Sequence, residues 1–347
     1  MTEASEPAGR RSRLWPTLVA VTVSVVLLGW SLRGVDLAEF LASLRSARVA
    51  PILAAVLLAT SLFPLRVFRW RLLLRHADGT GLSWPAMWHP IAMGFMANNV
   101  LPFRVGEVVR VFAASRLGDV SFGAALSSVA VERIFDGLAL IGLLSVALFW
   151  AGISGDVSLG GVSLAQAATL GGILSGGALV GAILVVSFPR PAERLVRVVV
   201  PSAKWSTRII GLLEDLRHGL QALKSPGRVL GVVVWSVVLW LINGLSFYVA
   251  FKAFDIPVGL AGALLMQGVL ALGISVPSAP GYVGVFEAAI KLVLVSLYGV
   301  SNEVALAYAL TYHFTTFIPI TLLGLWSVAR TGLGLGGLRR AAASHGP

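Results

Sequence analysis

The sequence NNVLPFRVGEVVR, residues 98–110, places two asparagines, a proline, a glycine and three charged side chains inside an otherwise apolar part of the chain. Charged groups near the hydrocarbon core of a bilayer are unfavourable by several kcal/mol unless they face protein or water, so such a cluster indicates a functional site. Proline and glycine beside polar amides also favour a broken helix or a re-entrant turn, which a membrane protein tolerates only where protein or water covers the backbone.

The composition surrounding this stretch is that of a membrane protein. Of the 347 residues, 57% are hydrophobic and 12% are charged, against about a quarter charged in an ordinary soluble domain. Since about 20 residues cross a bilayer as a helix, each of the long apolar runs can span it: 14–32, 49–65, 122–150, 164–188, 229–251 and 304–329. The sequence therefore predicts an all-α polytopic membrane protein with about six full transmembrane helices.

The basic residues predict how the chain is oriented. The net charge is +11, and most arginines and lysines lie in residues 1–13, just after the second run, in residues 189–228 and after the last run. Under the positive-inside rule these segments are cytoplasmic. We expect a cytoplasmic N-terminal tail (1–13), a transmembrane domain (14–330) and a cytoplasmic C-terminal tail (331–347), with the loop 152–163 external. The positive charge is then a topology signal, with contacts to anionic headgroups, rather than a sign of nucleic-acid binding.

Two local patterns add to this prediction. Arginines interleave with Phe68 and Trp70 in residues 66–71, which is typical of side chains that reach the headgroups at the cytoplasmic boundary. The run 164–188 contains Gly172-xxx-Gly176 and Gly177-xxx-Gly181, small-residue spacings that favour close helix packing. The segment 36–48, apolar at helical spacing, is expected to lie on the outer interface.

The region around the opening stretch is predicted to be a re-entrant hairpin. Arg75 before residues 87–115 and Arg116 after them both read as cytoplasmic. A single crossing cannot put both ends on one side. A hairpin that turns near residues 98–102, with Pro102 and Gly106 shaping the turn, satisfies both.

A second broken region predicts a hairpin from the opposite face. Residues 259–299 are apolar but interrupted by Pro277-Ser278-Ala279-Pro280-Gly281, with Gly284 beyond. Their flanks, Lys252 and residues 301–303, read as external. Paired broken segments are the sequence pointer to a midplane substrate site in transporters.

The first hairpin carries chemistry suited to a phosphate. Arg104, Glu107 and Arg110 are three residues apart, so Glu107 can neutralise one or both arginines across adjacent helical turns. The surplus is positive, and arginine binds phosphate through two parallel hydrogen bonds. We expect Asn99, Arg104 and Arg110 to bind a lipid headgroup. The alternative is a buried structural ion network.

Other carboxylates are candidates for coupling. Glu132 and Asp136, with Arg133 between them, either pair with the hairpin arginines or bind a coupling ion or proton. Glu287 either forms an ion pair with Lys291, four residues on, or is a proton or cation site.

The sequence contains no recognisable catalytic or cofactor-binding motif. His313 lies deep in the last apolar run, where a packed, hydrogen-bonded histidine is more common than a proton relay. The histidines lack metal-ligand spacing, the chain has no cysteine, and no P-loop or nucleophile elbow is present. We predict no cofactor, no metal and no ATP-driven transport by this chain alone.

The motifs Asn99-x-x-Pro102-x-Arg104-x-Gly106-Glu107-x-x-Arg110, Glu132-Arg133-x-x-Asp136 and Pro277-x-x-Pro280-Gly281-x-x-Gly284-x-x-Glu287 together carry a resemblance. The chain resembles the lysylphosphatidylglycerol synthase transmembrane, or flippase-like, family over about residues 14–330. The resemblance implies a protein of the bacterial or archaeal cytoplasmic membrane that moves lipids between leaflets. Some relatives add a cytoplasmic aminoacyl-transfer domain; this chain ends soon after its last span, so we do not expect synthase activity.

The sequence thus predicts that two hairpins meet near the midplane and that the protein translocates a phosphate-bearing lipid, such as an aminoacylated phospholipid or a polyprenyl-phosphate carrier. Candidate coupling or counter-charge residues are Glu107, Glu132, Asp136 and Glu287. One alternative is an intramembrane lipid-modifying enzyme, which lacks a recognisable nucleophile or metal set; another is a non-catalytic partner of an envelope-lipid synthase. Expected partners are membrane lipids and an envelope-lipid synthase or lipid-linked glycosyltransferase, with homo-oligomerisation left open.

Overall fold

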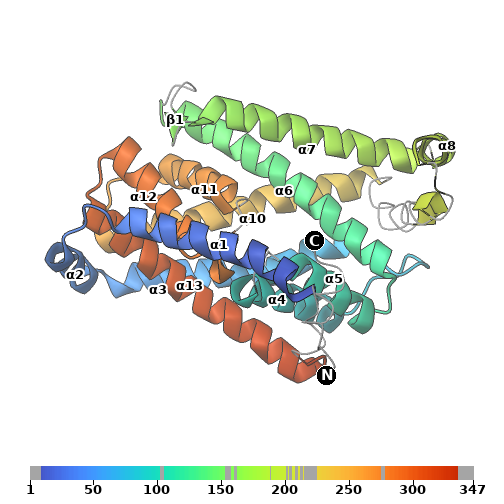
Figure 1. Ribbon diagram of the computed structural model, residues 1–347, viewed down its shortest axis with the longest axis horizontal. Coiled ribbons are helices and arrows are strands. Elements are labelled where there is room, and N and C mark those ends of the chain that lie inside the picture. Colours follow the sequence, from blue (N-terminus) through green and yellow to red (C-terminus); the bar gives the residue numbers. More distant parts are fainter. Residues whose placement is uncertain are drawn as a thin grey trace, which may run out of the picture.

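The apolar runs fold into helices that lie side by side along the length of a bundle (Figure 1). The computed structural model describes residues 9–101, 105–152, 158–159, 162–187, 189–200, 202, 205–207, 210–211, 214, 225–274 and 278–334. Its long helices are α1 (Gly9–Leu32), α3 (Val49–Leu73), α6 (Phe122–Trp150), α7 (Leu164–Ser187), α10 (Pro226–Phe251) and α13 (Asn302–Thr331).

The predicted multi-pass architecture is confirmed. By length and composition, and among the described residues, five helices can cross a membrane: Val49–Leu73, Phe122–Trp150, Pro226–Phe254, Pro280–Tyr298 and Asn302–Thr331. A sixth crossing results if α1 and the short helix α2 (Leu37–Ser46) count as one span bent by 88°. Four of the five match predicted full spans, and Pro280–Tyr298 is an arm of the second predicted hairpin. The predicted span 164–188 contributes only the shorter apolar helix Thr169–Gly181 among the described residues.

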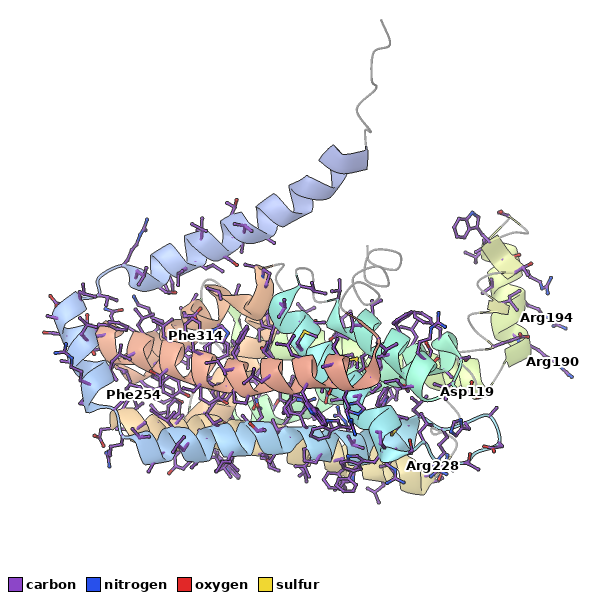
Figure 2. The ribbon with its side chains drawn as sticks, turned by 90° about the horizontal axis from the view of Figure 1, so that it is seen from below. Asp119, Arg190, Arg194, Arg228, Phe254 and Phe314 are labelled. Atoms are coloured by element: carbon purple, nitrogen blue, oxygen red, sulfur yellow. The ribbon has the colours of Figure 1, made fainter. Side chains whose placement is uncertain are left out.

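The short elements lie at the ends of the bundle. The carboxylate of Asp36 caps α2 by accepting hydrogen bonds from the backbone of Ala38 and Glu39, as expected of an N-cap aspartate. At the opposite end lies α8 (Pro189–Val199), and between α6 and α7 two short strands, β1 (Ser158–Leu159) and β2 (Val162–Ser163), pair antiparallel. Figure 2 shows that the first half of α1 stands away from the other helices.

The first predicted hairpin consists of α4 (Trp84–Val100) and α5 (Gly106–Leu117). The two helices touch where their glycines meet, because a Cβ atom on Gly106 would lie 2.1 Å from the carbonyl oxygen of Gly94. The backbone N–H of Gly106 donates to Oδ1 of Asn98 at 2.7 Å, which closes the turn. Pro102 and Arg104 lie outside the described residues.

The second predicted hairpin consists of α11 (Leu260–Ile274), the 3-10 turn η4 (Pro280–Tyr282) and α12 (Val285–Tyr298). Gly281 and Gly284 have φ of +71° and +87°, values that glycine adopts without strain. A Cβ atom on Gly284 would also lie 2.3 Å from the carbonyl oxygen of Ser24 in α1. Pro277 lies outside the described residues.

The two hairpins enter the bundle from opposite ends, as predicted. The end of α5 at Gly118 lies against Leu82, which precedes α4, so the first hairpin opens toward the C-terminal end of α3. Near the start of α3, the N–H of Arg48 donates to the carbonyl of Ala253, and the second hairpin opens there. Their turns meet in between, since a Cβ atom on Gly281 would lie 3.4 Å from the carbonyl oxygen of Asn99.

The close packing that the glycine spacing of α7 predicted is not seen at those glycines among the described residues. A Cβ atom on Gly172, Gly176, Gly177 or Gly181 would meet nothing within 4 Å among the described atoms. The helix packs on α6 through other residues, with Gly137 against Ser175 and Gly171 against Ile141. Small-residue spacing allows close approach but does not decide which face of a helix is used.

Candidate functional site

Two cavities of about 230 and 380 Å³ lie where the hairpin turns meet. They share lining residues from both hairpins and from α3 and α10: Arg66, Phe95, Asn99, Trp240, Ala271, Ile274 and Tyr282. The larger cavity is also lined by Asn98, Glu107, Arg110, Arg133 and Asp136. Polar and charged groups therefore surround a space inside an apolar bundle, where the sequence predicted a midplane site.

Glu132 is the centre of the charged groups beside the larger cavity. Its carboxylate is fully buried and accepts two parallel hydrogen bonds from the guanidinium of Arg110, at 2.7 and 2.8 Å. Arg69 Nη2 lies 3.0 Å and Arg133 Nη2 lies 2.7 Å from its Oε1 atom. Three arginines thus share one carboxylate, which gives Glu132 the compensation that a buried charge needs.

Asp136, one turn further along α6, extends the same network. It pairs with Arg69 and lies 3.0 Å from Arg133 Nη2, while Trp240 Nε1 donates to its Oδ1 atom at 2.9 Å. Arg69 also donates to the hydroxyl of Ser236 at 3.0 Å. The network therefore joins α3, α5, α6 and α10.

Arg110 of the first hairpin does not pair with Glu107, the partner that helical spacing favoured. Arg110 binds Glu132 rather than Glu107, and its guanidinium lies over the ring of Trp70 at 3.9 Å. The alternative pairing between the α6 carboxylates and a hairpin arginine is therefore seen. Glu107 lines the larger cavity, and no ion pair to it occurs among the described residues. The headgroup role of Arg110 stays a prediction.

Asn98 and Asn99 have separate tasks. Asn98 holds the turn through Gly106, whereas Asn99 lines both cavities and donates through Nδ2 to Oγ1 of Thr321 at 3.0 Å. Asn99 therefore ties the first turn to α13 beside the cavity. The predicted headgroup ligand Arg104 cannot be placed, since it lies outside the described part.

Arg66 is a candidate site residue that was not predicted from the sequence. The pattern in residues 66–71 predicted arginines at the headgroups, but Arg69 is fully buried and Arg66 lines both cavities. Only Arg71 of the three is exposed. In the part of the chain that the structure describes, no carboxylate pairs with Arg66; its guanidinium lies over the ring of Phe95 at 4.6 Å. The three-residue spacing of Arg66 and Arg69, which puts both on one helix face, was the available signal.

The charges around the larger cavity do not balance. The arginines are Arg66, Arg69, Arg110 and Arg133, and the carboxylates are Glu107, Glu132 and Asp136. Among the described residues, four positive groups stand against three negative ones, so positive charge is in excess; Arg104 lies outside this count. An excess of positive charge is complementary to an anion such as a phosphodiester.

The second hairpin brings Glu287 to a histidine rather than to Lys291. Glu287 Oε2 accepts the N–H of Gly284 at 2.6 Å, and its Oε1 atom lies 2.6 Å from Nδ1 of His313. Lys291 instead donates to the carbonyl oxygens of Ser31 and Arg33, both at 2.8 Å. The predicted alternative of a Glu287–Lys291 ion pair does not form, because the ammonium satisfies carbonyls at the C-terminal end of α1.

His313 is a hydrogen-bonded buried residue, as the sequence favoured. Its Nε2 atom lies 2.8 Å from the carbonyl oxygen of Gly281, and the ring lines the smaller cavity. No group of three or more metal-ligating side chains occurs within the described ranges.

Comparison with known proteins finds matches along most of the chain. The family model described as the lysylphosphatidylglycerol synthase TM region matches residues 17–324. Glycosyltransferase AglD of Haloferax volcanii is 27% identical over 328 residues, which cover 86% of this chain and 51% of that protein. The UPF0104 membrane protein MJ1078 of Methanocaldococcus jannaschii is 22% identical over 230 residues, 65% of this chain and 90% of that protein. The chain thus spans about half the length of AglD.

Proposed function

This chain belongs to the lysylphosphatidylglycerol synthase transmembrane family, and on that premise we propose that it moves a phosphate-bearing lipid between the leaflets of a membrane. Aminoacylated phospholipids and polyprenyl-phosphate carriers are the lipid classes that fit. We place the protein in the cytoplasmic membrane of a bacterium or archaeon, with residues 1–13 and 331–347 in the cytoplasm and the translocating domain at 14–330.

The observation that carries the proposal is Arg66. An arginine without a carboxylate partner in the described structure faces a cavity inside an apolar bundle. Such a group is unfavourable unless an anion or water accompanies it. A lipid phosphate supplies that anion, and its acyl chains remain in the surrounding hydrocarbon.

The remaining polar residues have roles in the same proposal. Asn99 and Arg110 line the larger cavity together with Arg66 and contribute headgroup ligands. Arg104, which lies outside the described residues, is a further headgroup ligand in this proposal. Glu107, Glu132, Asp136 and Glu287 are counter-charges or coupling groups. Glu132 and Asp136 hold Arg69, Arg110 and Arg133 in place, so the arginines are positioned before the lipid arrives. Such pre-organisation lowers the ordering cost of binding.

Reconstituted protein tests the proposal. The purified chain is placed in liposomes of phosphatidylglycerol and phosphatidylethanolamine that carry a trace of headgroup-fluorescent phosphatidylethanolamine, and an impermeant reductant reports which leaflet holds the dye. Arg66→Gln removes one charged ligand, worth about 1.5–3 kcal/mol, so we expect the transport rate to fall about tenfold or more.

The matched control is Arg71→Gln. Arg71 lies on the same helix but is exposed, so its removal should leave the rate near that of the wild type. Equal rates for the two folded variants would remove Arg66 from the site. Lipids extracted after the assay are analysed by mass spectrometry, since a chemically altered lipid would identify an intramembrane enzyme instead.

A second candidate function follows from the relative named Glycosyltransferase AglD. In this alternative the domain serves a lipid-linked glycosyltransferase, as a non-catalytic partner that holds or delivers its lipid. Co-purification with such an enzyme, combined with an absence of lipid movement in liposomes, would favour this alternative over translocation.

A further inference from the structure

Glu287, His313 and the carbonyl of Gly281 form a buried chain of hydrogen bonds beside the smaller cavity. The ring of His313 lies between two acceptors, with Nδ1 at 2.6 Å from Glu287 and Nε2 at 2.8 Å from Gly281. The other carboxylate oxygen of Glu287 accepts the N–H of Gly284. Glu287 is fully buried and His313 is 6% exposed.

The hydrogen-bond acceptors on either side of His313 determine how many protons these hydrogen bonds contain. A backbone carbonyl cannot donate, so Nε2 must carry a proton. Nδ1 and the carboxylate oxygen cannot lie 2.6 Å apart with no proton between them, because two lone pairs would then face each other. The arrangement therefore contains a second proton, carried either by the carboxyl group or by the imidazole ring.

Loss of the second proton cannot leave both contacts intact. A neutral imidazole has one N–H, which can be given to Glu287 or to Gly281 but not to both. The charged carboxylate is the stronger acceptor, so the remaining proton moves to Nδ1. The hydrogen bond to the carbonyl of Gly281 is then lost.

The hydrogen bond between His313 and the carbonyl of Gly281 holds a turn that lines the cavities. Gly281 and Tyr282 form the η4 turn and line the smaller cavity, and Tyr282 lines the larger one as well. Both residues have positive φ, +71° and +62°, a conformation that a non-glycine residue keeps only when its surroundings hold it. His313 is one of the groups that hold this turn against α13.

We propose that Glu287 and His313 together bind one exchangeable proton, and that this proton fastens the turn of the second hairpin to α13 and couples proton binding to lipid binding. The proton site stands on its own geometry; its coupling role rests on the proposed lipid translocation. The proton reaches the pair from the cavity, since His313 lines it, while Phe286, Phe314 and Phe317 surround the ring on other sides.

The neighbouring charges make the coupling electrostatic. Arg66 of α3 lines the same cavity as His313. The other titratable groups that line this cavity are Tyr312 of α13, whose hydroxyl contacts Ser246, and Tyr282 of η4. Lys291 of α12 is turned to the carbonyls of α1, and the facing residues of α10 and α11, Asn243 and Gln267, are uncharged. A lipid phosphate at Arg66 therefore favours a proton on the pair, and linkage requires the converse.

Nitrogen NMR of the whole chain, labelled at its five histidines and held in nanodiscs of phosphatidylglycerol and phosphatidylcholine, reads the proton site without any transport. The signal of His313 is the one that His313→Gln removes. On raising the pH we expect Nε2 to lose its proton while Nδ1 keeps one. Glu287→Gln offers an amide N–H to Nδ1 and should hold the ring neutral and protonated at Nε2 throughout.

The control for the titration is Glu303→Gln, a carboxylate at the start of the same helix, which should leave the His313 titration unchanged. The proton site would be overturned if Nε2 of the wild type kept its proton at every pH tested. It would also be overturned if His313 titrated in Glu287→Gln as it does in the wild type. Either failure leaves the Arg66 test of lipid movement unaffected, so the two proposals fail separately.

The coupling is tested in the liposomes described above, with and without a pH gradient. We expect the gradient to speed movement of the fluorescent phosphatidylethanolamine in the wild type and in His89→Gln, whose histidine packs on Trp326 of α13. In Glu287→Gln the ratio of the two rates should be about one. A wild-type rate that ignores the gradient, or a Glu287→Gln rate that follows it, would overturn the coupling.

Discussion

At the scale of single residues, Glu132 decides whether the charged network holds. Three guanidinium groups approach its carboxylate, so it offsets like charges that would otherwise repel each other in a buried place. Asp136 relieves only Arg69 and Arg133. Arg110 depends on Glu132 alone among the carboxylates that the structure describes.

We therefore expect Glu132→Gln to destabilise the protein strongly. Removing one partner of a buried ion pair leaves an uncompensated charge and costs about 3–5 kcal/mol. Thermal unfolding in detergent, followed by circular dichroism, measures the effect. The control is Glu39→Gln on the exposed face of α2, which should change stability by no more than about 0.5 kcal/mol. Similar melting curves for both variants would contradict the proposed importance of the network.

At the scale of elements, the two hairpins depend on glycine for different physical reasons. Gly106 is needed for space, because α4 and α5 touch through their backbones at Gly94. Gly281 and Gly284 are needed for conformation, because both have positive φ. In each hairpin, described residues at or beside the turn thereby reach the middle of the bundle, where Asn99, Gly106 and Gly281 line a cavity.

The lack of space at Gly106 predicts the result of Gly106→Ala. The added methyl would lie 2.1 Å from the Gly94 carbonyl and 2.4 Å from Asn98 Oδ1, so the helices must separate, which typically costs about 1–3 kcal/mol. We expect a lower melting temperature and slower lipid movement in the liposome assay.

The matched control is Gly176→Ala in α7, where the methyl would meet nothing within 4 Å among the described atoms. Alanine is the better helix former by about 0.5–1 kcal/mol, so stability should stay the same or rise. Destabilisation by Gly176→Ala comparable to that by Gly106→Ala would show that the predicted glycine spacing in α7 is a packing surface after all.

At the scale of the whole molecule, the bundle has two distinct ends. Figure 1 shows α2 at one end and α8 at the other, and Figure 2 shows Phe254 at the first end and Arg190 and Arg194 at the second. The basic residues of 189–200 thus lie far from α2. Under the positive-inside rule we therefore expect the α8 end in the cytoplasm and α2 outside.

Because the chain has no cysteine, single-cysteine labelling tests this orientation directly. We expect an impermeant thiol reagent to label Ser46→Cys, on α2, in intact cells, and Ser202→Cys, after α8, only once the cells are opened. Both positions are exposed. Labelling of Ser202→Cys in intact cells, with protection of Ser46→Cys, would reverse the topology.

Four of the membrane-spanning helices, the two broken segments and the cluster of charged residues could be predicted from the sequence alone. These features depend on local composition: long apolar runs favour spanning helices, and proline and glycine interrupt helices wherever they occur. The flanking charges of each broken segment were enough to predict hairpins that enter from opposite faces. Glu107, Arg110, Glu132 and Asp136 could be identified as candidate site residues because charge is rare in such a chain.

Which of these charges pair with each other became visible only in the folded structure. Arg110 and Glu132 are 22 residues apart, Arg69 and Asp136 are 67 apart, and spacing within one helix favoured neighbours such as Glu107 instead. Pairing in a low-dielectric interior goes to whichever opposite charge packing brings nearest, and helix packing is not encoded in local spacing. For the same reason Arg66 lines both cavities without a carboxylate partner among the described residues, Lys291 binds the end of α1, and Glu287 contacts His313.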